Sequence, residues 1–173
     1  MNYEAILYEV KDNILTITLN RPEKLNAFNF NMQSDLIDAI DKANNDDEVK
    51  AIIVTGAGRG YCAGADLSAG KDTFNMEARD DRKGAISENG EIDWSHSGVR
   101  DGGGRVTLKM FECLKPIISA CNGPAVGVGI TMQLAMDIRL ASEQAKYGFV
   151  FARRGLVPEA CSSWFLPRIV GVS

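Results

Sequence analysis

The N-terminal part of the chain alternates apolar and polar residues and then changes to a helical spacing. The stretch ILYEVKDNILTITLNRP alternates on both sides of Asp12-Asn13, which predicts two strands joined by a turn. Apolar residues then recur three and four positions apart from Met32 to Ala43. This spacing predicts an amphipathic helix over about 31–44.

Two later apolar runs resemble buried strands, and each leads into a junction of small residues. KAIIVTG is followed by GYCAGADL, and PIISACNG is followed by PAVGVGIT. Short apolar runs bounded by Gly are typical of strands buried on both faces. We expect further helices over about 105–114 and in VGITMQLAMD, strands in IRLAS and KYGF, and a helical turn region interrupted by Pro167. Strands that alternate with helices predict an α/β fold.

The stretch from about 68 to 104 differs from the rest of the chain. It is polar and rich in Gly, with few periodic apolar positions. We expect a long, mobile insertion there, with some helix around 74–83, because loops of this length are commonly functional lids or disordered. The whole chain, residues 1–173, is otherwise expected to form one domain, without sequence repeats or a linker.

The composition excludes some classes of function. Hydrophobic residues make up 45% and charged residues 24% of the 173 positions, as in an ordinary globular protein. The formal net charge of -4 argues against nucleic acid as the main partner. No segment has the apolar length of a signal peptide or a bilayer span, so we expect a cytoplasmic protein that binds no membrane.

The residue types that bind metals or act as nucleophiles give no pattern. The four cysteines have neither zinc-ligand spacing nor a CxxC pair, and we expect reduced, mostly buried thiols and no metal site. They are Cys62, Cys113, Cys121 and Cys161. The one histidine, His96, lies in the 68–104 stretch, which argues against a Ser-His-Asp triad.

The two small-residue junctions carry the candidate chemistry. N–H groups at the start of a helix have no partner within the helix, so two of them from separate turns can form an oxyanion hole. The glycines of the second junction, Gly123, Gly127 and Gly129, would let a ligand carbonyl approach the main chain. Close packing of strand on helix also favours Gly and is the competing interpretation.

Five segments together resemble a known family. LNRPEKLNAF, GYCAGADL, KPIISACNGPAVGVG, LAMDIRLAS and GLVPEACSSWFLPRIVG resemble, in order, the signatures of the crotonase superfamily, the enoyl-CoA hydratase/isomerase family. The resemblance covers nearly the whole chain outside the 68–104 stretch. It implies an α/β spiral of repeated β-β-α units that binds acyl-CoA thioesters, with the N–H groups of Ala65 and Val128 as the oxyanion hole. From the paired small-residue junctions, we also expect Val at position 127 or 129 to block the thioester and largely preserve the fold.

The resemblance also bears on the catalytic acid. Family hydratases use two glutamates, and the matching positions here hold Thr131 and Phe151, which cannot act as bases. Glu159 resembles the single catalytic carboxylate of the family's 3-enoyl to 2-enoyl-CoA isomerases. On the residues alone, a surface Glu that caps the following turn competes with this role. We expect apolar neighbours that raise its pKa, namely Leu156, Val157, Trp164 and Phe165.

The residues expected to bind CoA follow from the same resemblance. They are Arg21, Lys24, Leu25, Ala27, Ala63, Asp66 and Leu67, with Arg21 and Lys24 meeting the CoA phosphates. Asp66 is also expected to cap a helix that starts there. Arg153 and Arg154 are further candidates for phosphate or subunit contacts. CoA is part of the substrate, and no separate cofactor is expected.

The leading expectation for function is double-bond isomerisation of an enoyl-CoA. The alternatives are hydration of a 2-enoyl-CoA, thioester hydrolysis, and a non-catalytic acyl-CoA-binding or assembly subunit. Family chains continue into C-terminal helices that cover the acyl pocket and support trimers, and we expect this helical region to be largely absent here. With such helices the resemblance implies a homo-oligomer, a trimer or dimer of trimers. Without them, apolar surface near Trp164, Phe165 and Ile169 should be exposed.

Overall fold

The fold was analysed in a computed structural model, which describes residues 2–70, 73 and 83–172. The expected helix at 74–83 therefore lies almost wholly outside the described residues. None of the described helices has the length and hydrophobicity that a membrane-spanning segment needs.

The first strands and the first helix form as their patterns predict. Strands β1 (Ile6–Lys11) and β2 (Ile14–Leu19) pair antiparallel around Asp12 and Asn13, which have φ of 51° and 62°. Two consecutive left-handed residues match the twist of a tight hairpin. Helix α1 (Phe30–Asn45) begins after Asn29, whose side chain accepts a hydrogen bond from the backbone N–H of Met32.

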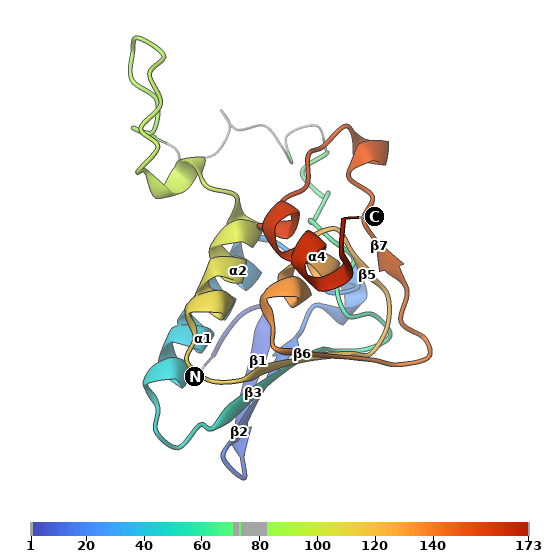
Figure 1. The fold of residues 1–173 in the computed structure, drawn as a ribbon. Helices are drawn as coiled ribbons and strands as arrows, with labels where there is room; N and C mark the ends of the chain where they lie inside the picture. Colours follow the sequence, from blue (N-terminus) through green and yellow to red (C-terminus); the bar gives the residue numbers. More distant parts are fainter. Residues whose placement is uncertain (1, 71–72, 74–82, 173) are drawn as a thin grey trace.

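The main sheet is mostly parallel and has the order β1-β2-β3-β4-β6. Strands β3 (Ala51–Gly56), β4 (Ile117–Cys121) and β6 (Ile138–Ala141) extend the hairpin, and every pair after β1–β2 is parallel. Helices α1, α2 (Gly102–Glu112) and α4 (Ser162–Val170) lie on one side of this sheet (Figure 1). The side chains of β2 and β3 that face this layer are fully buried: Leu15, Ile17, Leu19, Ile52 and Val54.

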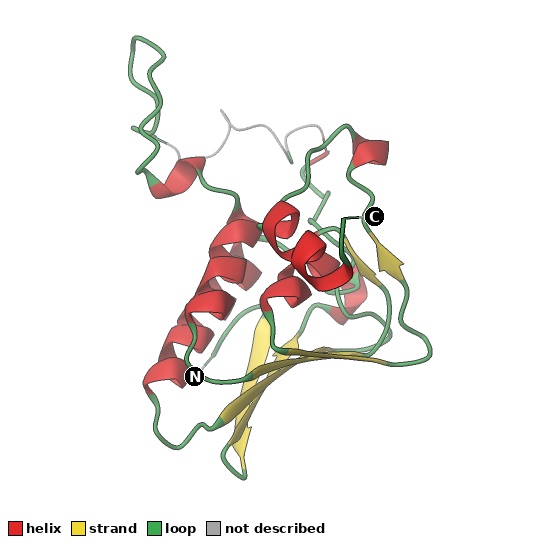
Figure 2. Cartoon of the chain, in the orientation of Figure 1, coloured by secondary structure: helices red, strands yellow, loops and turns green. Residues whose placement is uncertain are grey.

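A second, shorter ladder of parallel segments positions the candidate site. Strands β5 (Ala125–Val126) and β7 (Tyr147–Gly148) pair in parallel, Cys62 bridges to Ala125, and Phe28 bridges to Ala65. The long strands after β1 are thus each followed by a short extended segment and later by helix (Figure 2). This order is the repeated β-β-α unit expected from the family resemblance, and the expected α/β spiral is confirmed.

Two helical regions differ from the expectation. VGITMQLAMD forms only α3 (Val128–Thr131) and a 3₁₀ segment, η5 (Met132–Ala135), before the chain turns into β6. Helix α4 is not interrupted at Pro167 but continues to Val170. The proline removes the bond to the carbonyl of Ser163, and because Ser163 is exposed, water can replace it.

Part of the 68–104 stretch is ordered into the body of the protein. Helix α2 begins at Gly102, earlier than the expected start near 105. Before it, residues 84–99 extend away from the body at the top of Figure 1, with a single bridge between Ile86 and Ile92 and a short 3₁₀ turn at Ser97–Val99. Two further 3₁₀ turns, η1 (Pro22–Lys24) and η6 (Ala152–Arg154), lie elsewhere in the described part of the chain.

All four cysteines are free thiols. Cys62 and Cys121 are buried, whereas Cys113 and Cys161 are only partly buried, so the expectation of mostly buried thiols holds for half of them. Burial raises the pKa of Cys62 to about 12, which keeps this thiol protonated near neutral pH.

Candidate active site

The two small-residue junctions lie side by side. Cys62 and Ala125 are parallel neighbours, and the N–H of Val126 donates to the carbonyl of Cys62 at 2.9 Å. Ala65 follows Cys62 by three residues, and Val128 follows Ala125 by three. The parallel register therefore brings Ala65 and Val128 to the same level, with Ala65 still bridged to Phe28 on its other side.

The N–H groups of Ala65 and Val128 have no acceptor among the described residues. Each follows a glycine with left-handed backbone, Gly64 with φ of 99° and Gly127 with φ of 53°. The two glycines face each other, because a Cβ placed on Gly127 would lie 3.8 Å from the Cα of Gly64. Two unpaired donors at the ends of adjacent segments can converge on one ligand oxygen, as in an oxyanion hole.

The other two glycines of the second junction serve packing. A Cβ on Gly123 would lie 2.2 Å from the carbonyl oxygen of Arg59, and a Cβ on Gly129 would lie 2.2 Å from that of Cys62. Neither backbone oxygen can move without shifting its whole segment. The expectation that Val at position 129 largely preserves the fold is therefore wrong. At position 127 there is space for a side chain, but the φ of 53° strains any residue other than glycine, so Val there also disturbs the local backbone.

Glu159 reaches the same junction from the far end of the chain. The hydroxyl of Thr131 donates to Oε1 of Glu159 at 2.7 Å. On the other side, a Cβ added to Gly103 would lie 2.6 Å from Oε2 of Glu159 and 2.8 Å from a methyl group of Val128. The carboxylate thus lies between the start of α2 and the residues that carry the Val128 N–H.

The surroundings of Glu159 favour its protonated form. Its pKa is raised to about 7, chiefly by burial, while the hydrogen bond from Thr131 lowers the pKa and the nearby charge of Asp101 adds to the rise. A carboxyl group with a pKa near 7 can both take up and return a proton at neutral pH.

Asp101 fixes the turn that carries Glu159 and was not predicted from the sequence. Its carboxylate accepts from the N–H groups of Gly103 and Gly104 as the N-cap of α2, and from the N–H of Ala160 at 2.7 Å. Ala160 and the residue after it both have left-handed backbone, with φ of 52° and 56°. The signal was present, since Asp followed by GGGR and apolar residues at helical spacing is a helix start.

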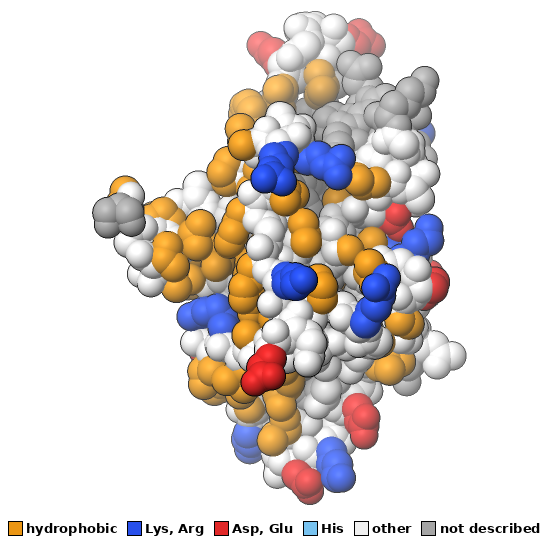
Figure 3. Space-filling model, turned by 90° about the vertical axis from the view of Figure 1, so that its right-hand side faces the viewer, with side chains coloured by type: hydrophobic (Ala, Val, Ile, Leu, Met, Phe, Trp, Pro, Cys, Tyr) orange, Lys and Arg blue, Asp and Glu red, His pale blue; other side chains and the backbone are white. Residues whose placement is uncertain are grey.

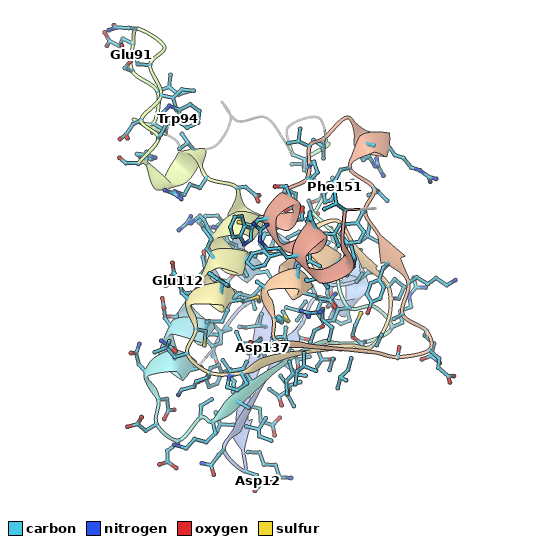
Figure 4. All side chains as sticks on the ribbon, in the orientation of Figure 1. Asp12, Glu91, Trp94, Glu112, Asp137 and Phe151 are labelled. Atoms are coloured by element: carbon cyan, nitrogen blue, oxygen red, sulfur yellow. The ribbon has the colours of Figure 1, made fainter. Side chains whose placement is uncertain are left out.

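The expected apolar neighbours of Glu159 are only partly correct. Val157 is 80% exposed and Trp164 is 55% exposed, with the guanidinium of Arg168 stacked on its ring. The contacts that bury the carboxylate come instead from α2 and α3. These helices are far from Glu159 in the sequence, so the sequence pattern around Glu159 does not predict them. Phe151, at the second hydratase acid position, is buried, and Figure 4 shows it beside the segment that leads to α4.

The sequence pattern of enoyl-CoA hydratase/isomerase matches residues 9–173. The chain belongs to this family. The match includes both junctions and Glu159, so the site described above lies within the part of the chain that the family shares.

Individual family members agree with this assignment. An enoyl-CoA hydratase of Alternaria alternata is 41% identical over 160 residues, covering 92% of this chain and 48% of that protein. A 1,2-epoxyphenylacetyl-CoA isomerase of Escherichia coli K12 is 35% identical and covers 97% of this chain and 59% of that protein. The crystal structure of an enoyl-CoA hydratase/isomerase from Pseudoalteromonas atlantica matches with a TM-score of 0.76 and 35% identity, over 98% of this chain and 58% of that one. The chain spans about half the length of the curated relatives it matches.

The residues that the family resemblance assigns to CoA lie on two paired segments. Arg21 binds the carboxylate of Asp66 at 2.7 Å and donates to the carbonyl of Ala27, while the N–H of Ala63 donates to the carbonyl of Leu25. Lys24, Ala63 and Leu67 are exposed around this pairing. Arg21 is therefore held within the protein, and Lys24 is the cation at this end that faces solvent.

Asp66 does not cap a helix as expected. Its carboxylate accepts from the N–H of Ser68 at 2.9 Å, and no helix starts at residue 66, because residues 66–67 are irregular and 68–69 form a turn. Hydrogen bonds from Ser68, and then from Arg21, hold the pKa of Asp66 well below its usual range. The aspartate stays charged at any working pH, and its ion pair with Arg21 joins the segments 21–28 and 63–67.

The remaining candidates contact no residue of the site in the described structure. His96 Nδ1 accepts from the N–H of Gly98 within the segment that extends from the body, and Arg153 and Arg154 are exposed on η6. A surface hollow between α1 and α2, lined by residues such as Asp41 and Lys109, includes no site residue. Among the described residues, no three His, Cys, Asp or Glu side chains group as metal ligands.

Proposed function

We propose that this site binds the thioester of an acyl-CoA and moves a proton along its acyl chain. The thioester oxygen accepts from the N–H groups of Ala65 and Val128, and Glu159 faces the acyl carbons. The observation that carries the proposal is the position of the Glu159 carboxylate, which touches the same turn that presents the Val128 N–H. The carboxyl group of Glu159 and the two N–H donors could thus contact the same thioester and the carbons next to it.

The leading reaction is conversion of a 3-enoyl-CoA to a 2-enoyl-CoA. The carboxylate of Glu159 takes a proton from the carbon next to the thioester carbonyl, and the C–H electrons form a dienolate. Its negative charge develops on the thioester oxygen, where each hole donor is worth about 2.7–4 kcal/mol. The protonated Glu159 then returns the proton to the carbon two further along, which leaves the double bond conjugated and the carboxylate regenerated.

Isomerisation is favoured because it needs only one acid. The two positions that hold glutamates in family hydratases are Thr131 and Phe151, both of them buried. A pKa of about 7 lets Glu159 serve as base and as acid in the same turnover. The relative from Escherichia coli is named as an isomerase, which supports this class of reaction.

Hydration of a 2-enoyl-CoA is the second candidate. The relative from Alternaria alternata is named as an enoyl-CoA hydratase, at 41% identity. In this reaction Glu159 would take a proton from water, and the oxygen of that water would attack the carbon two from the thioester carbonyl carbon. The protonated Glu159 would then return the proton to the carbon next to the carbonyl, which forms the 3-hydroxyacyl-CoA. Thioester hydrolysis and acyl-CoA binding without turnover remain the other candidates.

For CoA itself, we propose that it lies along the paired segments of residues 21–28 and 63–67. Exposed Lys24 is the proposed phosphate contact. Arg21 is proposed to act indirectly, because its guanidinium already binds Asp66 and the carbonyl of Ala27.

The test is a panel of 2-enoyl- and 3-enoyl-CoA thioesters assayed for double-bond isomer, 3-hydroxyacyl product and free CoA. Glu159→Gln keeps the shape of the side chain and removes the proton carrier, so turnover should fall by roughly 10²–10⁴-fold. Acyl-CoA affinity should change little, because the hole and the CoA segments remain. Glu143→Gln makes the same chemical change at an exposed position and should behave as wild type.

The products distinguish the candidates. Isomer, with exchange of the protons next to the thioester in deuterated buffer, supports the leading reaction, whereas 3-hydroxyacyl-CoA or free CoA supports hydration or hydrolysis. Acyl-CoA binding without any product identifies a binding protein. Full activity in Glu159→Gln excludes Glu159 as the acid.

A further inference from the structure

The Thr131 hydroxyl lies between the proposed acid and the peptide group of the proposed hole. Its oxygen is 2.7 Å from Oε1 of Glu159 and 3.2 Å from the carbonyl oxygen of Gly127. The side chain is 0% exposed, so no water competes for these contacts. A hydroxyl has a single proton and can donate it to only one of the two acceptors at a time.

The charge of Glu159 decides which acceptor receives that proton. When Glu159 is ionised it can only accept, and charged acceptors form the stronger bond, so Thr131 donates to the carboxylate. When Glu159 is protonated, its own O–H can donate to the Thr131 oxygen. The Thr131 hydroxyl then donates its hydrogen bond to the carbonyl of Gly127, four residues back in the same turn.

The carbonyl of Gly127 and the N–H of Val128 belong to one peptide group. A hydrogen bond accepted by the carbonyl polarises the amide, which makes its N–H a stronger donor. The N–H that would bind the thioester oxygen therefore strengthens when Glu159 holds a proton. In the proposed reaction this is the moment at which the enolate charge is present.

We propose that Thr131 is a positioning residue that couples the protonation of Glu159 to the donor strength of the Val128 N–H. The proposal rests on the proposed function for its role in catalysis. The coupling itself is a property of the protein without substrate and can be measured there. The competing interpretation is that Thr131 only bonds back to its own helical turn, with no effect on the acid.

Other titratable groups near Glu159 do not replace this coupling. From α2, Asp101 faces Glu159 and raises its pKa, but its carboxylate is occupied by the N–H groups of Gly103, Gly104 and Ala160. The thiols of Cys62 and Cys161 also lie near Glu159, and the pKa of each is raised by burial, so both remain neutral. Among the described residues, the hydroxyl of Thr131 is the side-chain donor bonded to Glu159.

The first test compares Thr131→Val with Thr131→Ser. Valine keeps the shape and removes the hydroxyl, so the carboxylate of Glu159 loses its donor and its pKa should rise by about one unit. Serine keeps the hydroxyl and should titrate within a few tenths of a unit of wild type. The measurement is a ¹³C NMR titration of carboxyl-labelled glutamate in the unliganded protein, with the Glu159 signal assigned by its loss in Glu159→Gln.

The kinetic readout is the dependence of kcat/KM on pH for wild type, Thr131→Val and Thr131→Ser. In Thr131→Val the pH at which kcat/KM rises should be higher by the same amount as the pKa of Glu159. In addition, kcat should fall about tenfold while KM changes less than about twofold. Thr131→Ser should restore both. If Thr131→Val titrates as wild type and has the wild-type profile, Thr131 is structural only and the proposal is wrong.

The second test needs no substitution at Thr131. The amide signal of Val128 should shift downfield as pH falls, with the same midpoint as the Glu159 carboxyl, and should not titrate in Glu159→Gln. A Val128 amide that stays constant while Glu159 titrates overturns the coupling, even if Thr131→Val fails to fold. Because neither NMR measurement uses substrate, a protein that turns over no enoyl-CoA refutes the proposed function without deciding this proposal.

Discussion

At the scale of single residues, the site depends on a carboxyl group kept partly out of water. Glu159 has little contact with the exposed residues beside it in the sequence, and is buried by Gly103, Val128 and Thr131 from two other elements. Its pKa near 7 is therefore a product of the tertiary structure, with burial as the largest cause. Such placement makes the acid reactive at a cost in stability.

That cost gives a prediction about stability and pH. The pKa of Glu159 is raised from 4.5 to about 7 on folding, so the folded state holds its proton more tightly than the unfolded state. Its contribution to stability is full below about pH 4.5 and is lost as pH rises through about 7. Glu159→Gln should thus unfold like wild type at pH 5 but be more stable at pH 8, by on the order of 1 kcal/mol.

Urea denaturation at the two pH values measures this difference. Glu143→Gln, at an exposed position, should show the same stability change at both pH values. A Glu159→Gln protein that gains no stability between pH 5 and pH 8 relative to wild type would show that the carboxyl is not held protonated by burial.

The sequence predicts some of these residues and not others. Glu159, Ala65 and Val128 are predicted from the sequence because each lies in a motif that the family resemblance places. The bond between Thr131 and Glu159 spans 28 residues, and no local pattern reports a contact at that separation. Asp101 lies between these cases, since its role as an N-cap is visible in the sequence and its bond to Ala160 is not.

At the scale of elements, prediction succeeds where one face of an element is buried. The hairpin and α1 follow from their alternation or spacing because the apolar positions mark the buried side. For β3, the apolar run predicted a strand buried on both faces, but only Ile52 and Val54 are fully buried and the other face is partly exposed. The predicted helix over VGITMQLAMD was too long. Because α3 and η5 are buried on nearly all sides, the apolar run has no period from which the length of the helix could be predicted. The two-residue strands β5 and β7 are too short to show alternation at all.

The start of α2 gives a prediction at this scale. Asp101 accepts three backbone N–H groups, two in α2 and one at Ala160. Asp101→Ala should lower the free energy of unfolding by about 1–2 kcal/mol through loss of the cap. It should also lower kcat, because the left-handed turn that follows Glu159 loses its anchor. Asp101→Asn keeps one acceptor oxygen, so its stability and its kcat should lie between those of wild type and those of Asp101→Ala.

A matched control separates the cap from the anchor. Asn29→Ala removes the N-cap of α1, whose side chain accepts from the N–H of Met32 and has no hydrogen bond to Glu159 or Asp101 in the described structure. It should cost similar stability in denaturant titrations without changing kcat under conditions where the protein is folded. If Asp101→Ala also leaves kcat unchanged, the bond to Ala160 does not position the acid.

At the scale of the whole molecule, apolar residues are exposed on several elements, and two of these groups lie on α4 and β6. On α4, Trp164 and Ile169 are 55% and 42% exposed as expected, whereas Phe165 packs edge-on against Phe111 with ring centroids 5.4 Å apart. On the edge strand β6, Ile138 and Leu140 are 49% and 57% exposed. Figure 3 shows hydrophobic side chains on one side of the molecule, interspersed with Lys and Arg.

The edge of the main sheet leads to the last prediction. Ile138 and Leu140 lie on the same face of β6, opposite partly buried Ile118 and Ala120 of β4, so an apolar row continues to an unpaired strand edge. An exposed apolar edge strand favours pairing between molecules.

The protein should therefore self-associate as its concentration rises, and Leu140→Lys should weaken this association by placing a charge in the contact. Trp164→Lys makes a comparable change on α4 and should have the smaller effect, with both compared by sedimentation velocity over a range of concentrations. Association that Trp164→Lys abolishes and Leu140→Lys leaves intact would place the contact on α4, and a monomer at every concentration would show that neither surface binds a second copy.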